Sequence, residues 1–185
     1  MAWIETIEES EAKELLSEVY TSLQNNRGKI SNIMKVQSLN PAAMKSHMDL
    51  YMAIMFGRSG LSREEREMIA TFVSVLNNCD YCMSHHGEAL NKYWKDMNRV
   101  NAFMESGSDS SLSQREIAIL HHADKLTKTP EFVIESDIKT LRIAGLSDRD
   151  ILDMALIVGY FNFVNRLALG LGVEFNQEEI QGYKV

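Results

Sequence analysis

The sequence predicts an all-α protein of about seven or eight helices. Apolar residues recur at intervals of three and four along the chain, and no convincing alternation of apolar and polar residues, the mark of a half-buried strand, is present. The chain contains only two prolines and ten glycines but eleven methionines. Few helix breakers and many flexible thioether side chains suit a core built between helices, where irregular gaps must be filled.

Capping signals and apolar periodicity place these helices along the chain. Asn40-Pro41 is a cap followed by a proline at the first helical position. Ser62 and Ser113 each begin a capping box, in which a serine and a glutamate three residues later satisfy each other's backbone donors. The expected helices span about 8–24, a short piece after Ser31, 41–57, 63–76, 79–94, 100–104, 114–126, a piece capped by Ser136 that stops at Gly145, and a long one after Ser147.

The chain of 185 residues is most simply one domain, 1–185, which can bury roughly 70% of the surface of its unfolded chain. A weak internal repeat at an offset of 85 residues matches Leu61-Ser62 with Leu146-Ser147 and Asn77 with Asn162. The polar stretch 106–111 is the best linker candidate. The expected parts are N-terminal helices (1–60), a cysteine-bearing helical hairpin (61–105), a second, non-catalytic repeat half (112–172) and a polar surface tail (173–185).

Charge and composition narrow the class of protein. The net charge of −7 argues against nucleic acid or an anionic membrane as partners, because both need clustered lysine and arginine. No apolar run approaches the roughly 18 residues of a membrane span, and the first residues lack the basic and apolar regions of a signal peptide. We therefore expect a cytoplasmic protein. In that compartment a Cys-x-x-Cys pair is more often catalytic or metal-binding than a structural disulfide.

The candidate site lies at residues 67–86. Cys79 and Cys82 are three apart and His86 follows four residues later, so on a helix the three side chains share one face. An Asn-Asn pair just before Cys79 predicts a reversal of the chain. An antiparallel helix pair would bring Glu67 level with His86, whereas a straight helix would hold Glu67 and Cys79 roughly 18 Å apart. At the positions 85 residues later, the repeat has Leu152, Val164, Leu167 and Leu171 in place of Glu67, Cys79, Cys82 and His86.

Three interpretations of this cluster remain open. In the redox interpretation, which we favour, the start of a helix at Cys79 stabilises a thiolate, and Cys82 passes its proton to His86, with Glu67 completing the relay. Attack on a peroxide then gives a sulfenic acid, and the second cysteine closes a disulfide. In the metal interpretation the cysteines, Glu67 and His86 or His85 bind zinc. In the third, the cysteines are only small buried residues. The remaining histidines are interpreted as ordinary helix residues, although the first of them could line a pocket: His47, His121 and His122.

The segments Leu-Ser-Arg-Glu-Glu-Arg-Glu-Met-Ile-Ala (61–70) and Asn-x-Cys-x-Tyr-Cys-x-x-x-His (77–86) resemble the AhpD-like alkylhydroperoxidases of the carboxymuconolactone decarboxylase superfamily. The resemblance is closest to the peroxidase-related branch. Further matches are Leu-Arg-x-Ala-Gly-Leu-Ser-Asp (141–148) and Phe-Asn-x-x-Asn-Arg-Leu-Ala (161–168). The resemblance implies an all-helical fold that assembles as trimers or hexamers, and hydroperoxide reduction through a cysteine pair.

The resemblance also implies a role for each site residue. Cys82 resembles the cysteine that attacks the peroxide, Cys79 its resolving partner, and Glu67 and His86 the proton relay. Tyr81 stands where the AhpD pattern has a further relay histidine, and a phenol with a pKa near 10 can hydrogen-bond but is a poor base. We expect a hydroperoxide substrate, a dithiol or lipoyl-type reductant, a homo-oligomer, and no cofactor or resident metal. The alternatives are a non-enzymatic redox or zinc sensor and a general thiol–disulfide oxidoreductase.

Overall fold

The computed structural model describes residues 2–180 and confirms the all-α class. This part of the chain holds ten helices, eight of them of seven or more residues, and no strand. The helices are α1 (Glu14–Arg27), α2 (Asn32–Lys35), α3 (Pro41–Phe56), α4 (Arg63–Leu76), α5 (Asp80–Trp94), α6 (Met97–Ser106), α7 (Gln114–Lys128), α8 (Glu135–Ile143), α9 (Asp148–Gly170) and α10 (Gln177–Ile180). Single 3₁₀ turns lie at Glu9–Glu11 and Pro130–Phe132.

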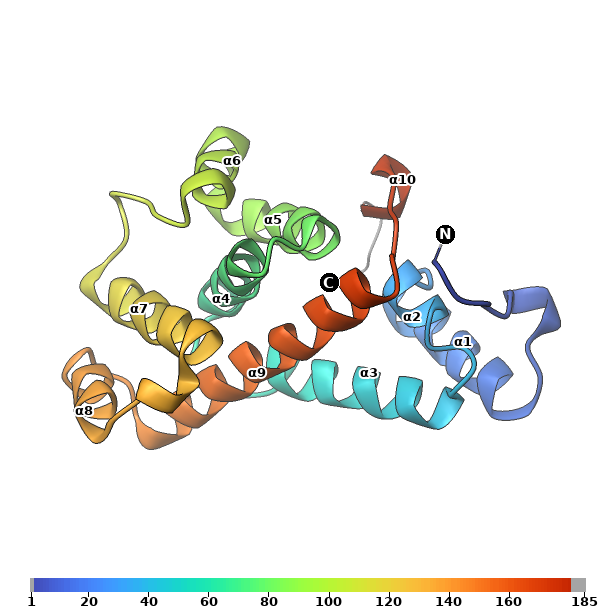
Figure 1. Ribbon diagram of the computed structural model, residues 1–185, viewed down its shortest axis with the longest axis horizontal. Coiled ribbons are helices and arrows are strands. Elements are labelled where there is room, and N and C mark those ends of the chain that lie inside the picture. The colour runs from blue at the N-terminus through green and yellow to red at the C-terminus, as the bar shows by residue number, and fades with distance from the viewer. Residues whose placement is uncertain (1, 181–185) are drawn as a thin grey trace.

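The long helix α9 (Asp148–Gly170) runs through the middle of the molecule (Figure 1). It packs against α4, α7 and α3, while α4 also packs against α5 and α7. Its length and composition are those of a membrane span, but half of its most apolar window is buried inside the fold. The helices packed against α9 account for its buried apolar residues, whereas others, such as Leu152 and Phe163, remain exposed.

Two apolar clusters hold the helices together. The main core joins α3 through α9, and its fully buried side chains include Met68, Phe103 and Phe161. A smaller cluster joins α1 to α2 and the start of α3 through Leu23 and Met44. The N-terminal helices therefore form their own packing unit beside the main core, and the space between these units is where the candidate site opens.

Four predicted helix starts are confirmed, but the helix expected over 8–24 begins only at Glu14, and Ser31 precedes α2 without a capping hydrogen bond from its side chain. Ser62, Ser113 and Ser147 form the capping boxes, and Asn40 Oδ1 accepts the backbone N–H of Ala43 at 3.2 Å. The prediction that Ser136 caps a helix is wrong, because α8 already begins at Glu135. The cap comes from Asp137, whose Oδ2 accepts the backbone N–H of Ile134 at 2.9 Å. A carboxylate at the third helical position can reach back to the N-cap in this way.

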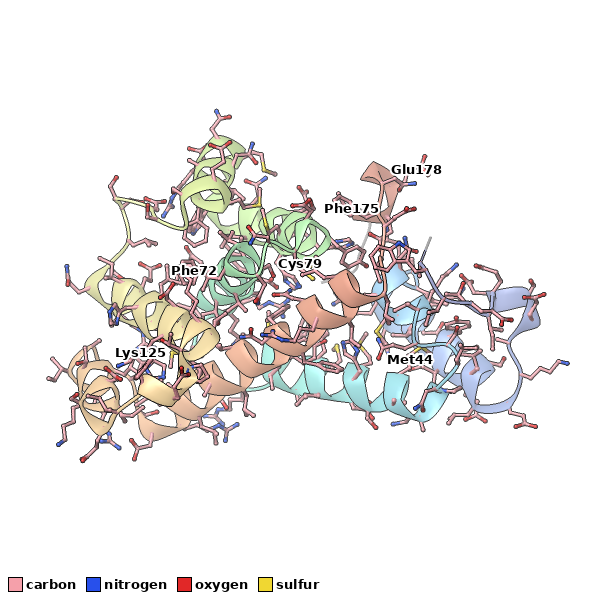
Figure 2. The ribbon with its side chains drawn as sticks, viewed as in Figure 1. Met44, Phe72, Cys79, Lys125, Phe175 and Glu178 are labelled. Atoms are coloured by element: carbon pink, nitrogen blue, oxygen red, sulfur yellow. The ribbon has the colours of Figure 1, made fainter. Side chains whose placement is uncertain are left out.

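The prediction of a polar surface tail holds only in part: Glu174, Asn176 and Glu178 are exposed, but the segment also makes buried contacts, and residues 181–185 lie outside the described part. Val173 is buried, and the ring of Phe175 packs edge-on against Tyr81 at 5.8 Å between centroids. Lys29 Nζ donates to the carbonyl of Glu178 at 2.6 Å. The segment therefore folds back beside α5 and α2, as the positions of Phe175 and Glu178 show (Figure 2).

Candidate active site

The site begins at the break between α4 and α5. Asn78 adopts φ of +52°, in the left-handed region that asparagine tolerates better than most residues. Cys79 then serves as the N-cap of α5, and its N–H donates to the carbonyl of Ser74 at 3.0 Å. The break turns the chain back, so that α5 packs along α4 and Cys82 lies in the first turn of the new helix. Cys79 lies where α5 approaches α9 (Figure 2).

The two cysteines are free thiols whose sulfur atoms lie 2.9 Å apart. Both are buried, but Cys82 borders a cavity and Cys79 lies behind it. The hydrogen bond with Cys82 lowers the pKa of Cys79, against the opposing effect of burial. The same contact and burial raise the pKa of Cys82. The amide of Asn165, on α9, stabilises the thiolate form of both sulfurs. The pair therefore ionises most easily at Cys79, and Cys82 needs a base to lose its proton.

Glu67 and His86 meet across the helical hairpin. The Nδ1–H of His86 donates to Glu67 Oε2 at 2.7 Å, and Nε of Arg63 donates to Glu67 Oε1 at 3.0 Å. Burial would raise the pKa of Glu67, but His86 and Arg63 together lower it below its ordinary value. The ring of Phe161 packs edge-on against His86 at 4.5 Å between centroids. Glu67 is therefore a buried carboxylate that fixes the orientation of the imidazole.

A cavity of about 460 Å³ opens onto this cluster, bordered by α1, α2, α3, α4, α5, α9 and α10. Cys82, His86 and Glu67 all line it. Much of the remaining wall is apolar or aromatic, with Met34, Met48, Tyr51, Phe161 and Val164 among its members. The volume is that of a site for a small organic ligand. Within residues 2–180, neither sulfur is hydrogen-bonded to His86, so proton transfer between them requires water or a bound ligand in the cavity.

Tyr81 lines the cavity, but its hydroxyl forms hydrogen bonds with groups outside the cysteine site. It accepts the backbone N–H of Ile33 at 3.1 Å and donates to Glu179 Oε1 at 2.8 Å. The ring of His85 stacks on the Tyr81 ring at 4.3 Å, and His85 Nε2 forms an ion pair with Glu179. Tyr81 thus joins α5 to α2 and to the C-terminal segment.

The histidine proposed as an alternative zinc ligand, His85, uses both ring nitrogens on other partners, since its Nδ1–H donates to the carbonyl of Tyr81 at 2.7 Å. Residues 2–180 contain no group of three or more His, Cys, Asp and Glu side chains placed to hold one metal ion. His47 borders the cavity, whereas His121 and His122 on α7 do not.

Sequence reasoning missed several residues of the site. Arg63 precedes Glu67 by four residues, and this helical spacing is a signal that would have identified the pair. Asn165 lies in the block 161–168 that resembles the family, and only the packing of α9 against α5 brings its amide to the sulfurs. Glu179 and Tyr160 reach the site only through packing, and no local pattern points to them.

Comparison with known proteins places this geometry in a family. The model of the carboxymuconolactone decarboxylase family matches residues 41–125. A peroxidase-related protein from Silicibacter sp. TM1040 is 30% identical, with a TM-score of 0.83 over 95% of this chain and 93% of that one. An AhpD-core, peroxidase-related protein from Ralstonia eutropha JMP134 is 27% identical, with a TM-score of 0.87 over 97% and 94% of the two chains. A variant of the debrominase Bmp8, solved in complex with 2,3,4-tribromopyrrole, is 20% identical and has a TM-score of 0.76 over 95% and 96%.

The fold is the AhpD-like all-helical fold, which the sequence predicted. The chain belongs to the carboxymuconolactone decarboxylase superfamily, in its peroxidase-related branch.

Proposed function

We propose that this protein is a thiol-dependent hydroperoxide reductase, with a peroxiredoxin-type activity carried by Cys82 and Cys79. One observation supports it above the others. A single cavity reaches the sulfur of Cys82 and the His86–Glu67 pair, while a second sulfur lies 2.9 Å behind the first. An attacking thiol, a proton acceptor and a resolving thiol are the three groups that such a reaction requires.

The first half of the reaction oxidises Cys82. His86, held by Glu67, accepts the thiol proton through water, and the thiolate attacks the terminal oxygen of the hydroperoxide. A sulfur–oxygen bond forms and the oxygen–oxygen bond breaks. Its electron pair leaves on the alkyl oxygen, which takes the proton from His86 and departs as an alcohol. Cys82 is now a sulfenic acid.

The second half closes a disulfide. Cys79 attacks the sulfenic sulfur, and the hydroxyl leaves as water with the Cys79 proton. The lowered pKa of Cys79 favours its thiolate and suits this role. A dithiol or lipoyl-type reductant then reopens the disulfide, and the cytoplasmic setting proposed for the protein supplies such thiols. Tyr81, which the resemblance placed beside the relay, instead anchors the cavity wall in this proposal.

The proposal is tested by turnover. Purified protein should consume cumene hydroperoxide with a dithiol reductant, and Cys82→Ser should reduce the rate to that of reductant alone. Ser84→Ala, a change in the same helix at a residue outside the cavity lining, is the control and should retain wild-type turnover. Equal, slow rates for the wild type and Cys82→Ser would refute the enzyme.

The same fold supports a second reaction class. Aromatic rings of Tyr51, Tyr160 and Phe161 line the cavity, and a flat halogenated ring, such as the tribromopyrrole bound to Bmp8, would pack against them. Reductive debromination would consume two thiols and release bromide. Bromide release from a brominated pyrrole without hydroperoxide turnover would favour this alternative. Stoichiometric oxidation without turnover of either substrate would favour a redox sensor or a general thiol–disulfide oxidoreductase.

We also propose a homo-oligomer, trimeric or hexameric. Exposed apolar residues recur at heptad-like spacing along α9, and their exposed fractions are 54% for Leu152, 42% for Leu156 and 46% for Phe163. A contiguous apolar stripe of this kind is a typical protein–protein surface. Light scattering on the purified protein measures the assembly, and a monomer would refute the proposal.

A further inference from the structure

A second chain of hydrogen-bonded side chains reaches the cavity and has no part in the mechanism above. The hydroxyl of Tyr160, on α9, lies 2.5 Å from His47 Nε2, on α3. His47 Nδ1 lies 3.0 Å from Oε1 of Gln37. Tyr160 and His47 both line the cavity with Cys82. Gln37 and His47 are ten residues apart, whereas Tyr160 is 113 residues from His47.

The partners settle which atoms carry the hydrogens. The Nε2 of Gln37 donates to the carbonyl of Ile33 at 2.7 Å, which fixes the amide with its oxygen toward His47. His47 Nδ1 must therefore carry a hydrogen and donate it to that oxygen. Burial lowers the pKa of His47 to about 4, so the ring is neutral and has only this one N–H. Nε2 is then an acceptor, and it receives the hydroxyl hydrogen of Tyr160.

This arrangement fixes the direction in which the Tyr160 hydroxyl can form hydrogen bonds. Its single hydrogen is held by His47, so its oxygen can only accept a hydrogen bond from a ligand in the cavity. A phenol that donates to an imidazole is also a stronger acceptor, because hydrogen bonds in a chain polarise one another. Burial raises the pKa of Tyr160 well above its ordinary value, and ionisation of Tyr51 or Cys82 beside it would raise that pKa further. The phenol therefore keeps its proton.

We propose that Tyr160, positioned by His47 and Gln37, accepts a hydrogen bond from the terminal O–H of the hydroperoxide and so holds that oxygen for attack by Cys82. This inference rests on the proposed hydroperoxide reductase function. The terminal oxygen keeps its hydrogen throughout: the sulfur–oxygen bond forms to it, the oxygen–oxygen bond breaks, and the electron pair leaves on the alkyl oxygen, which His86 protonates. Tyr160 transfers no proton, and the hydrogen it holds becomes that of the sulfenic acid. The site thus selects peroxides that carry a free O–H over dialkyl peroxides, which have none.

The test compares a phenol of the cavity with one outside it. Tyr160→Phe should lower kcat/KM for cumene hydroperoxide about tenfold, the effect of one lost hydrogen bond, mainly through a higher KM. Tyr93→Phe removes a hydroxyl from an exposed ring of α5 outside the cavity lining and should change kcat/KM less than about twofold. Equal effects of the two substitutions would overturn the proposal.

Variants of His47 test whether the Tyr160 hydroxyl must donate its hydrogen to residue 47. His47→Gln can still accept the Tyr160 hydrogen and should restore kcat/KM to within about threefold of wild type. His47→Leu cannot accept it, so the phenol is free to donate into the cavity, and kcat/KM should fall about tenfold. This comparison also tests the proposed role of Tyr160 if the Tyr160→Phe variant does not fold. Equal activity of His47→Leu and His47→Gln would overturn the proposal.

A binding experiment separates this inference from the proposed function. Cumene hydroperoxide is titrated calorimetrically into Cys82→Ser, which cannot react, with and without Tyr160→Phe. The expected result is about tenfold weaker binding when the phenol hydroxyl is absent. Unchanged affinity, with normal wild-type turnover, would overturn only the role of Tyr160. Absent wild-type turnover, with the tenfold difference in affinity intact, would overturn the reductase and keep Tyr160 as the hydroperoxide-binding group.

Discussion

The hairpin of α4 and α5 and the single helix α9 are the two segments related by the proposed repeat, and they differ in one decisive respect. Both begin with a Leu-Ser capping box, and they touch where Asn77 Nδ2 donates to Asn162 Oδ1 at 3.1 Å. The first segment breaks after Leu76 and restarts at Asp80, whereas α9 continues for 23 residues. Asn78 takes the left-handed conformation at the break, and the related position in α9 is Phe163, which remains helical.

The difference shows what the proposed redox site requires of the backbone. A helix start places unpaired N–H groups beside the cysteines, and the reversal brings Glu67 to His86. A continuous helix offers neither, because it keeps residues 12 apart at a distance of roughly 18 Å. In α9 the position related to Glu67 is Leu152, whose side chain is exposed. Changing four side chains in α9 would therefore not create a second site.

The largest loss of turnover is expected when Cys79 is replaced by valine, the residue at the related position 164 of α9. Cys79→Val should leave one oxidation of Cys82 per chain and lower steady-state turnover at least about 100-fold, because an external thiol must replace a neighbour held in contact. Rapid mixing with cumene hydroperoxide should show a burst of one equivalent, and a sulfenic-acid trap should label Cys82. Wild-type steady-state turnover would show that Cys79 is not the resolving thiol.

Glu67→Gln is expected to have the next largest effect. The amide can still accept a hydrogen bond from His86, but it has no charge to stabilise the protonated imidazole, so kcat/KM should fall about 100-fold. Glu88→Gln is the matched control, since Glu88 lines the same cavity without contacting His86. A similar loss in both variants would point to the net charge of the cavity and not to a relay.

The features that could be predicted from the sequence are local. Helix caps, the spacing of the cysteines with His86, and the reversal at the Asn-Asn pair lie within one or two helical turns, where periodicity and capping chemistry decide the conformation. The meeting of Glu67 with His86 followed from these signals because only one tight turn separates the two helices. The contact between Arg63 and Glu67 was equally local and was available from their spacing.

The features that could not be predicted depend on how distant segments pack. Tyr81 and Glu179 are 98 residues apart, and His47 and Tyr160 are 113 apart. Neither pair leaves a periodic signal, because each contact forms only after the N-terminal helices and the C-terminal segment close around α5 and α9. The C-terminal segment reads as polar, and its apolar anchors, Val173 and Phe175, are too few to reveal the fold-back.

The pH dependence of stability tests whether Glu67 is an ionised, paired group. Its pKa in the folded protein lies below the ordinary value of 4.5, so the folded protein binds fewer protons than the unfolded chain between those two values. The stabilisation is complete above pH 4.5 and is lost as the pH falls through the lowered pKa. The difference in unfolding free energy between wild type and Glu67→Gln, measured by urea titration, should shrink from pH 7 to pH 3. A difference that stays constant would contradict an ionised Glu67.

The smallest effect is expected at the break itself, where the backbone and not the chemistry is changed. Asn78 has φ of +52°, which costs an ordinary residue about 1–2 kcal/mol, whereas glycine adopts it freely. Asn78→Ala should therefore lower the unfolding free energy by about 1 kcal/mol, and Asn78→Gly should change it by less than about 0.5 kcal/mol. Urea titration measures both values. If the two variants have the same unfolding free energy, the left-handed conformation at residue 78 does not determine where the helix breaks. The difference between the hairpin and α9 must then arise from packing around Asn77 and Asn162.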